Sequence, residues 1–109
     1  MDLTILIPTY NEEENIEMLI SKIKQVLEKI TESYEIIVMD GMSQDKTREN
    51  AEKADAKVFI RSSTSFRTFL IEGFPKCKGN YIVTIDSDFS HSPLYIKNLW
   101  DSRNDADIV

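Results

Sequence analysis

Hydrophobic residues in this chain gather in two kinds of segment, which alternate from one end of the chain to the other. The first kind is a short, nearly continuous run rich in β-branched residues, which predicts a buried strand. Such runs lie at Leu3–Ile7, Glu35–Met39, Lys57–Ile60 and Tyr81–Ile85, with a last one that begins at Asp107. The second kind has apolar residues every three or four positions, which predicts a helix with one buried face. These segments lie at about Glu12–Ile30, Gln44–Lys53 and Phe66–Lys76, and from Ser92 onward.

Capping residues predict where three of the helices begin. Asn11 precedes the first apolar stripe and is the expected N-cap, with Glu14 placed to complete a capping box. Ser43 is the expected N-cap of the second helix, which is polar and is expected at the surface. Ser92 and Pro93 form the N-cap and N1 pattern that opens the fourth helix.

Continuous apolar strands separated by helices predict an α/β fold: a mostly parallel, Rossmann-like sheet with helices on both faces. The 109 residues are enough for a single core, so residues 1–109 are predicted to form one domain. In sheets of this kind, ligands bind outside the carboxyl ends of the strands. The residues that follow each apolar run are therefore the candidates for function.

Composition restricts the classes of partner. Thirteen Lys and Arg against nineteen Asp and Glu give a net charge of −6. Because an acidic surface repels phosphates, no nucleic-acid partner is expected. A small anionic ligand can still bind if a cation or a helix N-terminus contacts it. No apolar stretch approaches the roughly 20 residues that span a bilayer, so no membrane span is expected. The chain has no basic leader region and has one cysteine, Cys77, so we expect a cytoplasmic domain. The thiol of Cys77 is expected to be inert and to be buried or half-buried.

Two carboxylates follow the fourth apolar run, at Asp86 and Asp88, separated by Ser87. As the strand ends in a turn, both can point to the same side. Carboxylate oxygens in this arrangement suit Mg²⁺ or Mn²⁺, which bridge to substrate phosphates. Such a metal would explain how an acidic protein accepts an anionic ligand. The alternative is that the two aspartates belong to an ordinary turn.

Other strand ends carry candidates with equally plain alternatives. Asp40 follows the second run and can accept hydrogen bonds from a ribose hydroxyl or a base N–H, or Asp40-Gly41 is simply a turn. Tyr10 can stack on a base, with Pro8 shaping its loop, or its ring packs on the core. Glu12 is also explained as a favourable charge in a first helical turn.

Two arginines, Arg61 and Arg67, lie near the end of the third run. Either can meet a phosphate. For both, the interpretation we favour is a solvated side chain at the surface.

Four blocks of sequence, in this order, resemble family 2 glycosyltransferases of the GT-A fold. Within that family they are most similar to dolichol-phosphate mannose synthases and related polyprenyl-phosphate sugar transferases. The blocks are Ile7–Glu12, Ile37–Thr47, Gly79–Asp88 and Phe89–Pro93. Together they span nearly the whole chain, which the resemblance identifies as the nucleotide-binding half of the GT-A fold.

The resemblance implies a binding site for a nucleotide-diphosphate sugar. Pro8, Tyr10 and Glu12 are then expected to line the nucleoside pocket, with Val38 and Asp40 at the base. GDP-mannose is the favoured donor because the block around Asp86 looks most like the mannosyl branch, and a UDP-sugar remains open.

The same resemblance implies that Asp86, Ser87 and Asp88 form a metal-binding triplet for Mn²⁺ or Mg²⁺, with Asp88 as a direct ligand. The metal would neutralise the diphosphate and stabilise it as a leaving group. The implied reaction is transfer of the sugar, with inversion, to an acceptor such as a polyprenyl phosphate at the cytoplasmic membrane face.

Two departures from the family pattern matter. Ser65–Phe69 stands where family members usually have a Gly/Lys-rich stretch. The family also has an acceptor-binding half, which supplies the general base, after the region matched here, so no catalytic residue is assigned. That half would cover one edge of the sheet, so an exposed edge at Asp107–Val109 predicts a homodimer or larger assembly.

The sequence leaves two other function classes as alternatives. One is a non-catalytic module that keeps the glycosyltransferase fold and binds the nucleotide sugar without turnover. The other is a receiver-like signalling domain, which is also short, acidic and doubly wound. Receiver domains have a pair of acidic residues after the first strand, where this chain has Pro8-Thr9-Tyr10.

Overall fold

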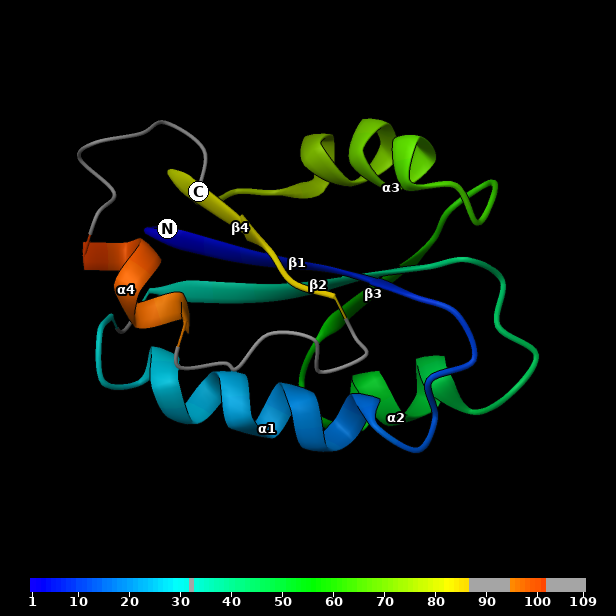
Figure 1. Cartoon of the computed structure of the whole chain (residues 1–109), viewed down its shortest axis with the longest axis horizontal. Helices are drawn as coiled ribbons and strands as arrows, with labels where there is room; N and C mark the ends of the chain where they lie inside the picture. The colour runs from blue at the N-terminus through cyan, green and yellow to red at the C-terminus, as the bar shows by residue number, and fades with distance from the viewer. Residues whose placement is uncertain (32, 87–94, 102–109) are drawn as a thin grey trace.

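The computed structural model describes residues 1–31, 33–86 and 95–101. Strands and helices alternate along the chain as expected (Figure 1). The elements are β1 (Leu3–Thr9), α1 (Ile16–Leu27), β2 (Tyr34–Asp40), α2 (Thr47–Lys53), β3 (Lys57–Ile60), α3 (Phe66–Gly73), the 3₁₀ turn η1 (Phe74–Lys76), β4 (Tyr81–Thr84) and α4 (Tyr95–Asp101). The predicted strand from Asp107 and the predicted helix start at Ser92 lie outside the described residues, so association through a sheet edge there stays a prediction.

The four strands form one parallel sheet in the order β3-β2-β1-β4. Leu3 of β1 pairs with Tyr34 of β2 on one side and with Tyr81 of β4 on the other. At the far end of the same ladder, Thr9 pairs with Asp40. Because every strand runs the same way, all four carboxyl ends meet at one edge of the sheet.

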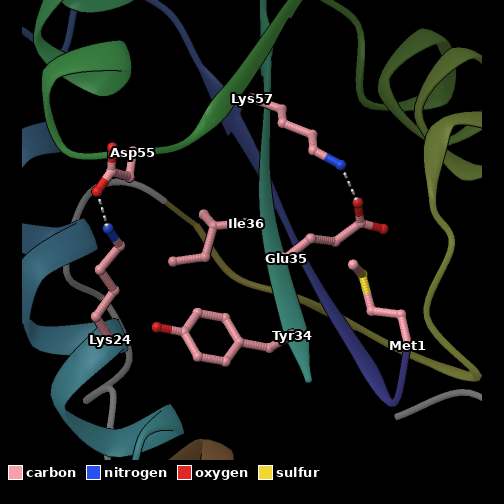
Figure 2. A pocket seen from close by; sticks show the side chains of 7 residues that line it. All are labelled: Met1, Lys24, Tyr34, Glu35, Ile36, Asp55 and Lys57. Carbon is pink, nitrogen blue, oxygen red and sulfur yellow. Dashed lines mark hydrogen bonds and ion pairs between the residues drawn. The ribbon is translucent and has the colours of Figure 1, made fainter. Parts of the chain in front are cut away.

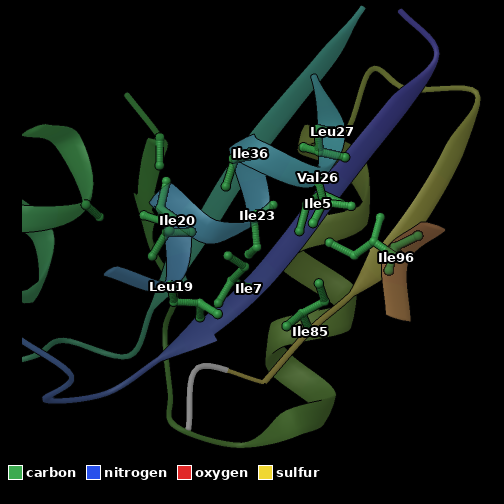
Figure 3. Packing of buried hydrophobic residues seen from close by; sticks show 14 of the residues in the cluster. Ile5, Ile7, Leu19, Ile20, Ile23, Val26, Leu27, Ile36, Ile85 and Ile96 are labelled. Atoms are coloured by element: carbon green, nitrogen blue, oxygen red, sulfur yellow. The ribbon is translucent and has the colours of Figure 1, made fainter. Parts of the chain in front are cut away.

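Helices cover both faces of this sheet, which confirms the predicted fold class. In Figure 1, α1 and α2 lie on one side and α3 on the other. Successive residues of β1 divide between the two layers, since Ile5 and Ile7 pack with α1 whereas Leu6 packs with Phe69 of α3. Figure 3 shows the larger layer, where β1, β2, α1 and α4 contribute buried aliphatic side chains.

A buried carboxylate joins the amino ends of the strands. Glu35 of β2 is 5% exposed and accepts hydrogen bonds from Thr4 Oγ1 (2.6 Å), the Lys78 backbone N–H (2.6 Å) and Lys57 Nζ (3.0 Å). Burial by itself would raise the pKa of Glu35, but these bonds outweigh burial and hold the pKa below its ordinary value. Glu35 is therefore an ionised carboxylate that links β1, β2, β3 and the loop before β4.

The predicted N-cap of α1 is wrong. The helix begins at Ile16, and Asn11 lies in the preceding loop with a positive φ of 51°. Its side-chain Oδ1 accepts a hydrogen bond from the Gln44 backbone N–H (3.0 Å) instead of from the first helical turn. Asn11 is therefore a contact between two loops.

The predicted N-cap of α2 is wrong for a similar reason. Ser43 is buried, and both its backbone N–H (2.7 Å) and its hydroxyl (2.5 Å) donate to the carboxylate of Asp40. The helix starts later, at Thr47. Ser43 thus stabilises the end of β2 and leaves the helix to begin four residues further on.

Candidate nucleotide-binding edge

Two loops lie side by side at the carboxyl edge: residues 10–15 after β1 and residues 41–46 after β2. Hydrogen bonds join these loops to each other and to the strand and helix ends beside them. The bonds run from Gly41 N to Thr9 O (2.9 Å), Asn11 N to Ser43 Oγ (2.8 Å), Gln44 N to Asn11 Oδ1 (3.0 Å), Glu12 N to Thr47 Oγ1 (2.8 Å) and Lys46 N to Glu13 Oε2 (3.0 Å). Each loop therefore fixes the conformation of the other, which makes a preorganised edge.

Asp40 lies beneath these loops with no exposed surface. Its Oδ1 accepts from Thr9 Oγ1 (2.7 Å) and Ser43 Oγ (2.5 Å), and its Oδ2 accepts from Ser43 N (2.7 Å) and Arg48 Nη1 (2.9 Å). Burial would raise the pKa of Asp40, but the bonds from Ser43, Thr9 and Arg48 outweigh it and lower the pKa. The carboxylate is thus ionised and organises the edge. Direct contact with a ligand would require one of these bonds to be exchanged.

Tyr10 is 46% exposed, so its ring does not pack in the core. It lies on the first of the two loops, one residue after the end of β1. Met42, on the second loop, is 51% exposed and has a positive φ of 63°. Each loop therefore presents one large apolar side chain to the outside.

The remaining predicted nucleoside residues differ in accessibility. Pro8 and Glu12 are half-buried beside Tyr10. Val38 is fully buried and belongs to the core layer that packs against α1. In the arrangement described, Val38 supports the floor of the site from below and presents no surface to a ligand.

Asp86 is exposed just beyond β4. The backbone N–H of Ile85 donates to Leu6 O (3.1 Å), so the pairing of β4 with β1 continues to Ile85, and Asp86 follows at the same carboxyl edge. Its carboxylate has the donor chemistry that Mn²⁺ and Mg²⁺ prefer. The other two members of the predicted triplet, Ser87 and Asp88, lie outside the described residues. Within residues 1–31, 33–86 and 95–101 no cluster of three acidic, His or Cys side chains is placed to hold a metal.

The surface position favoured for Arg61 is wrong. Its side chain is buried, with 4% of its surface exposed, and it donates from Nη2 to Thr9 O (3.1 Å) and from Nη1 to Ser65 O (3.1 Å). Burial lowers the pKa of the guanidinium, and the charges of Asp40 and Glu72 oppose that shift. The signal that the sequence offered was an arginine directly after an apolar strand. Arg67, in contrast, is exposed as expected.

Ser65 is a residue that sequence reasoning missed. Its hydroxyl accepts a hydrogen bond from the Thr68 backbone N–H (3.1 Å) and caps α3. The signal was present, because Ser65 stands immediately before the apolar stripe of that helix.

Cys77 is half-buried, and burial, together with the charge of Glu35, raises the pKa of its thiol to about 11. At neutral pH the thiolate fraction is then very small. This agrees with the expectation of an inert thiol.

A pocket of about 350 Å³ lies at the opposite end of the sheet (Figure 2). It is lined by Met1, Lys24, Tyr34, Glu35, Ile36, Asp55 and Lys57. Its two lysines are already paired, Lys24 with Asp55 (3.1 Å) and Lys57 with Glu35 (3.0 Å). Because it opens at the amino ends of the strands, this pocket is separate from the edge that carries Tyr10 and Asp86.

No helix in the described part of the chain has the length and apolar character needed to cross a membrane.

A parallel sheet with helices on both faces (Figure 1) places this chain in the class of doubly wound α/β domains, which bind their ligands at the carboxyl edge of the sheet. Residues 4–109 match the sequence family described as Glycosyl transferase family 2. The chain belongs to this family, which rules out the receiver-like alternative.

Two curated relatives show how much of an enzyme this chain matches. It is 34% identical over its whole length to a dolichol-phosphate mannosyltransferase of Pyrococcus furiosus, of which it covers 32%. Over 88% of its length it is 27% identical to an undecaprenyl-phosphate 4-deoxy-4-formamido-L-arabinose transferase of Pseudomonas fluorescens, of which it covers 30%. The chain therefore spans about a third of the length of these relatives.

Solved structures of glucosyl-3-phosphoglycerate synthase from Mycobacterium tuberculosis share the fold. One, in complex with Mn²⁺, UDP and glucosyl-3-phosphoglycerate, matches with a TM-score of 0.75 and 26% identity over 93% of this chain and 39% of that chain. Another, with Mn²⁺, UDP-glucose and phosphoglyceric acid, gives a TM-score of 0.78 and 25% identity over 93% and 38%. The expected GT-A architecture is confirmed.

Proposed function

We propose that this chain is the donor-binding part of a family 2 glycosyltransferase, and that the enzyme transfers a sugar with inversion from a nucleotide-diphosphate sugar to a polyprenyl phosphate. One observation carries the proposal. The two hydrogen-bonded loops hold the exposed Tyr10 ring at the carboxyl edge, and the β4 register brings the exposed carboxylate of Asp86 to the same edge.

In this proposal the nucleoside base stacks on Tyr10, with Pro8 and Glu12 beside it. The loop conformation is already fixed by its bonds to residues 41–46, so little ordering free energy is needed when the ligand binds. Val38 and Asp40 act from beneath, by shaping the floor and by holding the end of β1 against β2.

The diphosphate requires positive charge, because the chain carries a net charge of −6. We assign Asp86 and Asp88 as the residues that hold Mn²⁺ or Mg²⁺, with Ser87 between them. A divalent metal at this place supplies Lewis-acid stabilisation of the diphosphate leaving group. The M. tuberculosis neighbours were solved with Mn²⁺ together with UDP or UDP-glucose, which supports a metal at this edge.

The relatives divide on the nucleotide sugar. One curated relative is named as a mannosyltransferase, which favours a mannosyl donor for this chain, whereas the structural neighbours hold UDP and UDP-glucose. Both curated relatives are named for a polyprenyl-phosphate acceptor, which supports that acceptor class and an association with the membrane face. A module that binds the donor without turnover is the competing function.

Calorimetric titration of GDP and UDP, with and without Mn²⁺, tests the donor site. We expect metal-dependent binding of one nucleotide, and at least about a tenfold loss of affinity in Asp86→Asn, since each 1.4 kcal/mol is a factor of ten. Asp55→Asn is the matched control, because Asp55 is an exposed aspartate at the opposite end of the sheet. Binding of neither nucleotide, or binding that ignores Mn²⁺, contradicts the proposal.

Turnover separates the enzyme from the binding module. The protein is incubated with GDP-mannose or UDP-glucose, Mn²⁺ and a polyprenyl phosphate, and release of the nucleoside diphosphate is measured. Release that requires the polyprenyl phosphate establishes the transferase, and release that does not require it contradicts transfer to that acceptor.

A further inference from the structure

Arg61 is a buried cation that, within the described part of the chain, is bonded to no carboxylate. It directly follows β3, is 4% exposed, and forms an ion pair with no carboxylate among the described residues. Its two hydrogen bonds go to the neutral main-chain carbonyls of Thr9 and Ser65. Buried charges in proteins are normally paired with an opposite charge, so this arrangement is unusual.

The guanidinium is also incompletely satisfied. Within the described residues, its Nε is the buried side-chain polar atom that has no hydrogen-bond partner. A buried donor left unpaired costs free energy, and native proteins rarely retain one without a reason.

The acids near Arg61 are committed to other donors. Asp40 is bonded to Thr9, Ser43 and Arg48, and Glu72 accepts from both the N–H and the hydroxyl of Ser62. No carboxylate of the residues that the structure describes is therefore bonded to Arg61, although the charges of Asp40 and Glu72 still act on it from nearby.

The loop after β2 is built around this cation. A Cβ on Gly41 would lie 3.1 Å from Nη2 and 3.3 Å from Nε of Arg61, so the absence of a side chain lets the guanidinium lie against the loop backbone. The same group is bonded to Thr9, directly before Tyr10, and to the N-cap residue of α3. Arg61 thus lies under the junction of β1, β2 and α3.

We propose that Arg61 is the resident positive charge of the donor site, which attracts and positions the diphosphate from beneath the loops. This inference rests on the proposed function. Because Arg61 is buried, it acts through the low-dielectric floor rather than by contact, so it is a positioning residue. Its charge would add to that of a divalent metal held by Asp86 at the β4 end of the edge.

A purely structural role for Arg61 makes a different prediction. If its task is only to hold the carbonyls of Thr9 and Ser65, its loss distorts the loops and weakens every ligand equally. If its charge acts on the diphosphate, its loss weakens nucleoside diphosphates and spares uncharged nucleosides. The ratio of these two affinities therefore distinguishes the roles.

The experiment measures this ratio by NMR titration of guanosine and GDP, and of uridine and UDP, in the presence of Mn²⁺. For the nucleotide that binds, we expect Arg61→Met to lower the ratio of diphosphate affinity to nucleoside affinity about tenfold. The nucleoside affinity itself should stay within about twofold of wild type. Arg61→Lys keeps the charge and should retain most of the ratio. Lys29→Met removes an equal charge from an exposed site far from the edge and should leave the ratio unchanged.

A wild-type ratio in Arg61→Met overturns the inference. So does an equally large fall of the ratio in Arg61→Lys, which keeps the charge. The lysine variant also decides the matter if circular dichroism shows that the methionine variant does not fold. If the wild-type protein binds no nucleotide, the proposed function fails and the inference fails with it. If the wild type binds and the ratio does not respond to Arg61, only the inference fails.

Discussion

Met42 has a backbone conformation that residues with a side chain rarely adopt. Its φ is 63°, in the left-handed region, where the Cβ approaches the following carbonyl and raises the energy by about 1–2 kcal/mol. Its side chain is 51% exposed, so core packing does not compensate for this strain. The strain is confined to the loop that Asp40 and Ser43 hold in place.

Replacing Met42 with Asn is therefore expected to stabilise the protein by about 0.5–1 kcal/mol, since Asn tolerates the left-handed region better. Urea denaturation measures the free energy of unfolding. Met18→Asn, on the exposed side of α1, is the control and should lose a few tenths of a kcal/mol of helix propensity. A Met42→Asn variant that is no more stable than wild type would show that the loop imposes no strain.

Single residues show where sequence reasoning reached its limit. The positions of Tyr10, Asp40 and Asp86 after apolar runs predicted correctly that all three belong to one edge of the sheet. Their environments could not be predicted, because burial depends on which distant carbonyls and hydroxyls the fold brings close. Arg61 is the clearest case, since its carbonyl partners, at the end of β1 and just before α3, reach it only once the sheet has folded.

At the scale of elements, the approach of β1 to the loop before β4 depends on Gly79. A Cβ there would lie 2.5 Å from the Thr4 nitrogen and 2.6 Å from the Leu3 carbonyl carbon, distances that backbone atoms cannot accommodate. The Gly79 N–H donates to Thr4 Oγ1 at 2.9 Å, so the two segments touch directly. Any side chain at this position must push β4 away from β1.

Gly79→Ala is accordingly expected to destabilise the protein by about 1–3 kcal/mol, the usual cost of forced overpacking. The exposed neighbour Asn80→Ala should stay within about 0.5 kcal/mol of wild type. Denaturant midpoints of the two variants decide the outcome. Equal stability of the two alanine variants would mean that the strands adjust without cost.

The presence of each strand and helix was predicted better than its first and last residues. β3 has exactly the predicted bounds, and the other described strands differ from prediction by no more than two residues at either end. The periodicity of apolar residues is a property of the local sequence, so the strands and helices that it predicts are present in the folded protein. The helix starts predicted at Asn11 and Ser43 were wrong because both side chains accept backbone N–H bonds across the two loops. Those bonds depend on the long-range pairing of β1 with β2.

For the whole molecule, two buried carboxylates set the dependence of stability on pH. Glu35 and Asp40 lie at opposite ends of β2, and each has its pKa lowered below its ordinary value by hydrogen bonds that outweigh burial. A lowered folded-state pKa stabilises the protein above the unfolded-state pKa, and this contribution is lost as the pH falls through the folded-state pKa. Stability should therefore hold from neutral pH down to about 5 and then decline below about 4.

The variants Glu35→Gln and Asp40→Asn test this prediction. At pH 7 each should cost about 1–3 kcal/mol, because buried partners lose their charged acceptor. On acidification each should lose less stability than wild type, since one titrating group is gone. Urea midpoints at pH 7, 5 and 3 measure both effects, and an unchanged acid decline in both variants would assign the decline to other groups.

The central place of β1 in the sheet also affects how the protein is made. β1 is synthesised first, yet its neighbour β4 does not exist until Tyr81–Thr84 have been added. At about 5–20 residues per second, the ribosome needs roughly one to five seconds to travel from the end of β3 to the end of β4. Throughout that interval the nascent sheet has an open, almost wholly apolar edge, and such edges pair readily with other chains. The form of this protein that most needs a chaperone is therefore the unfinished chain on the ribosome.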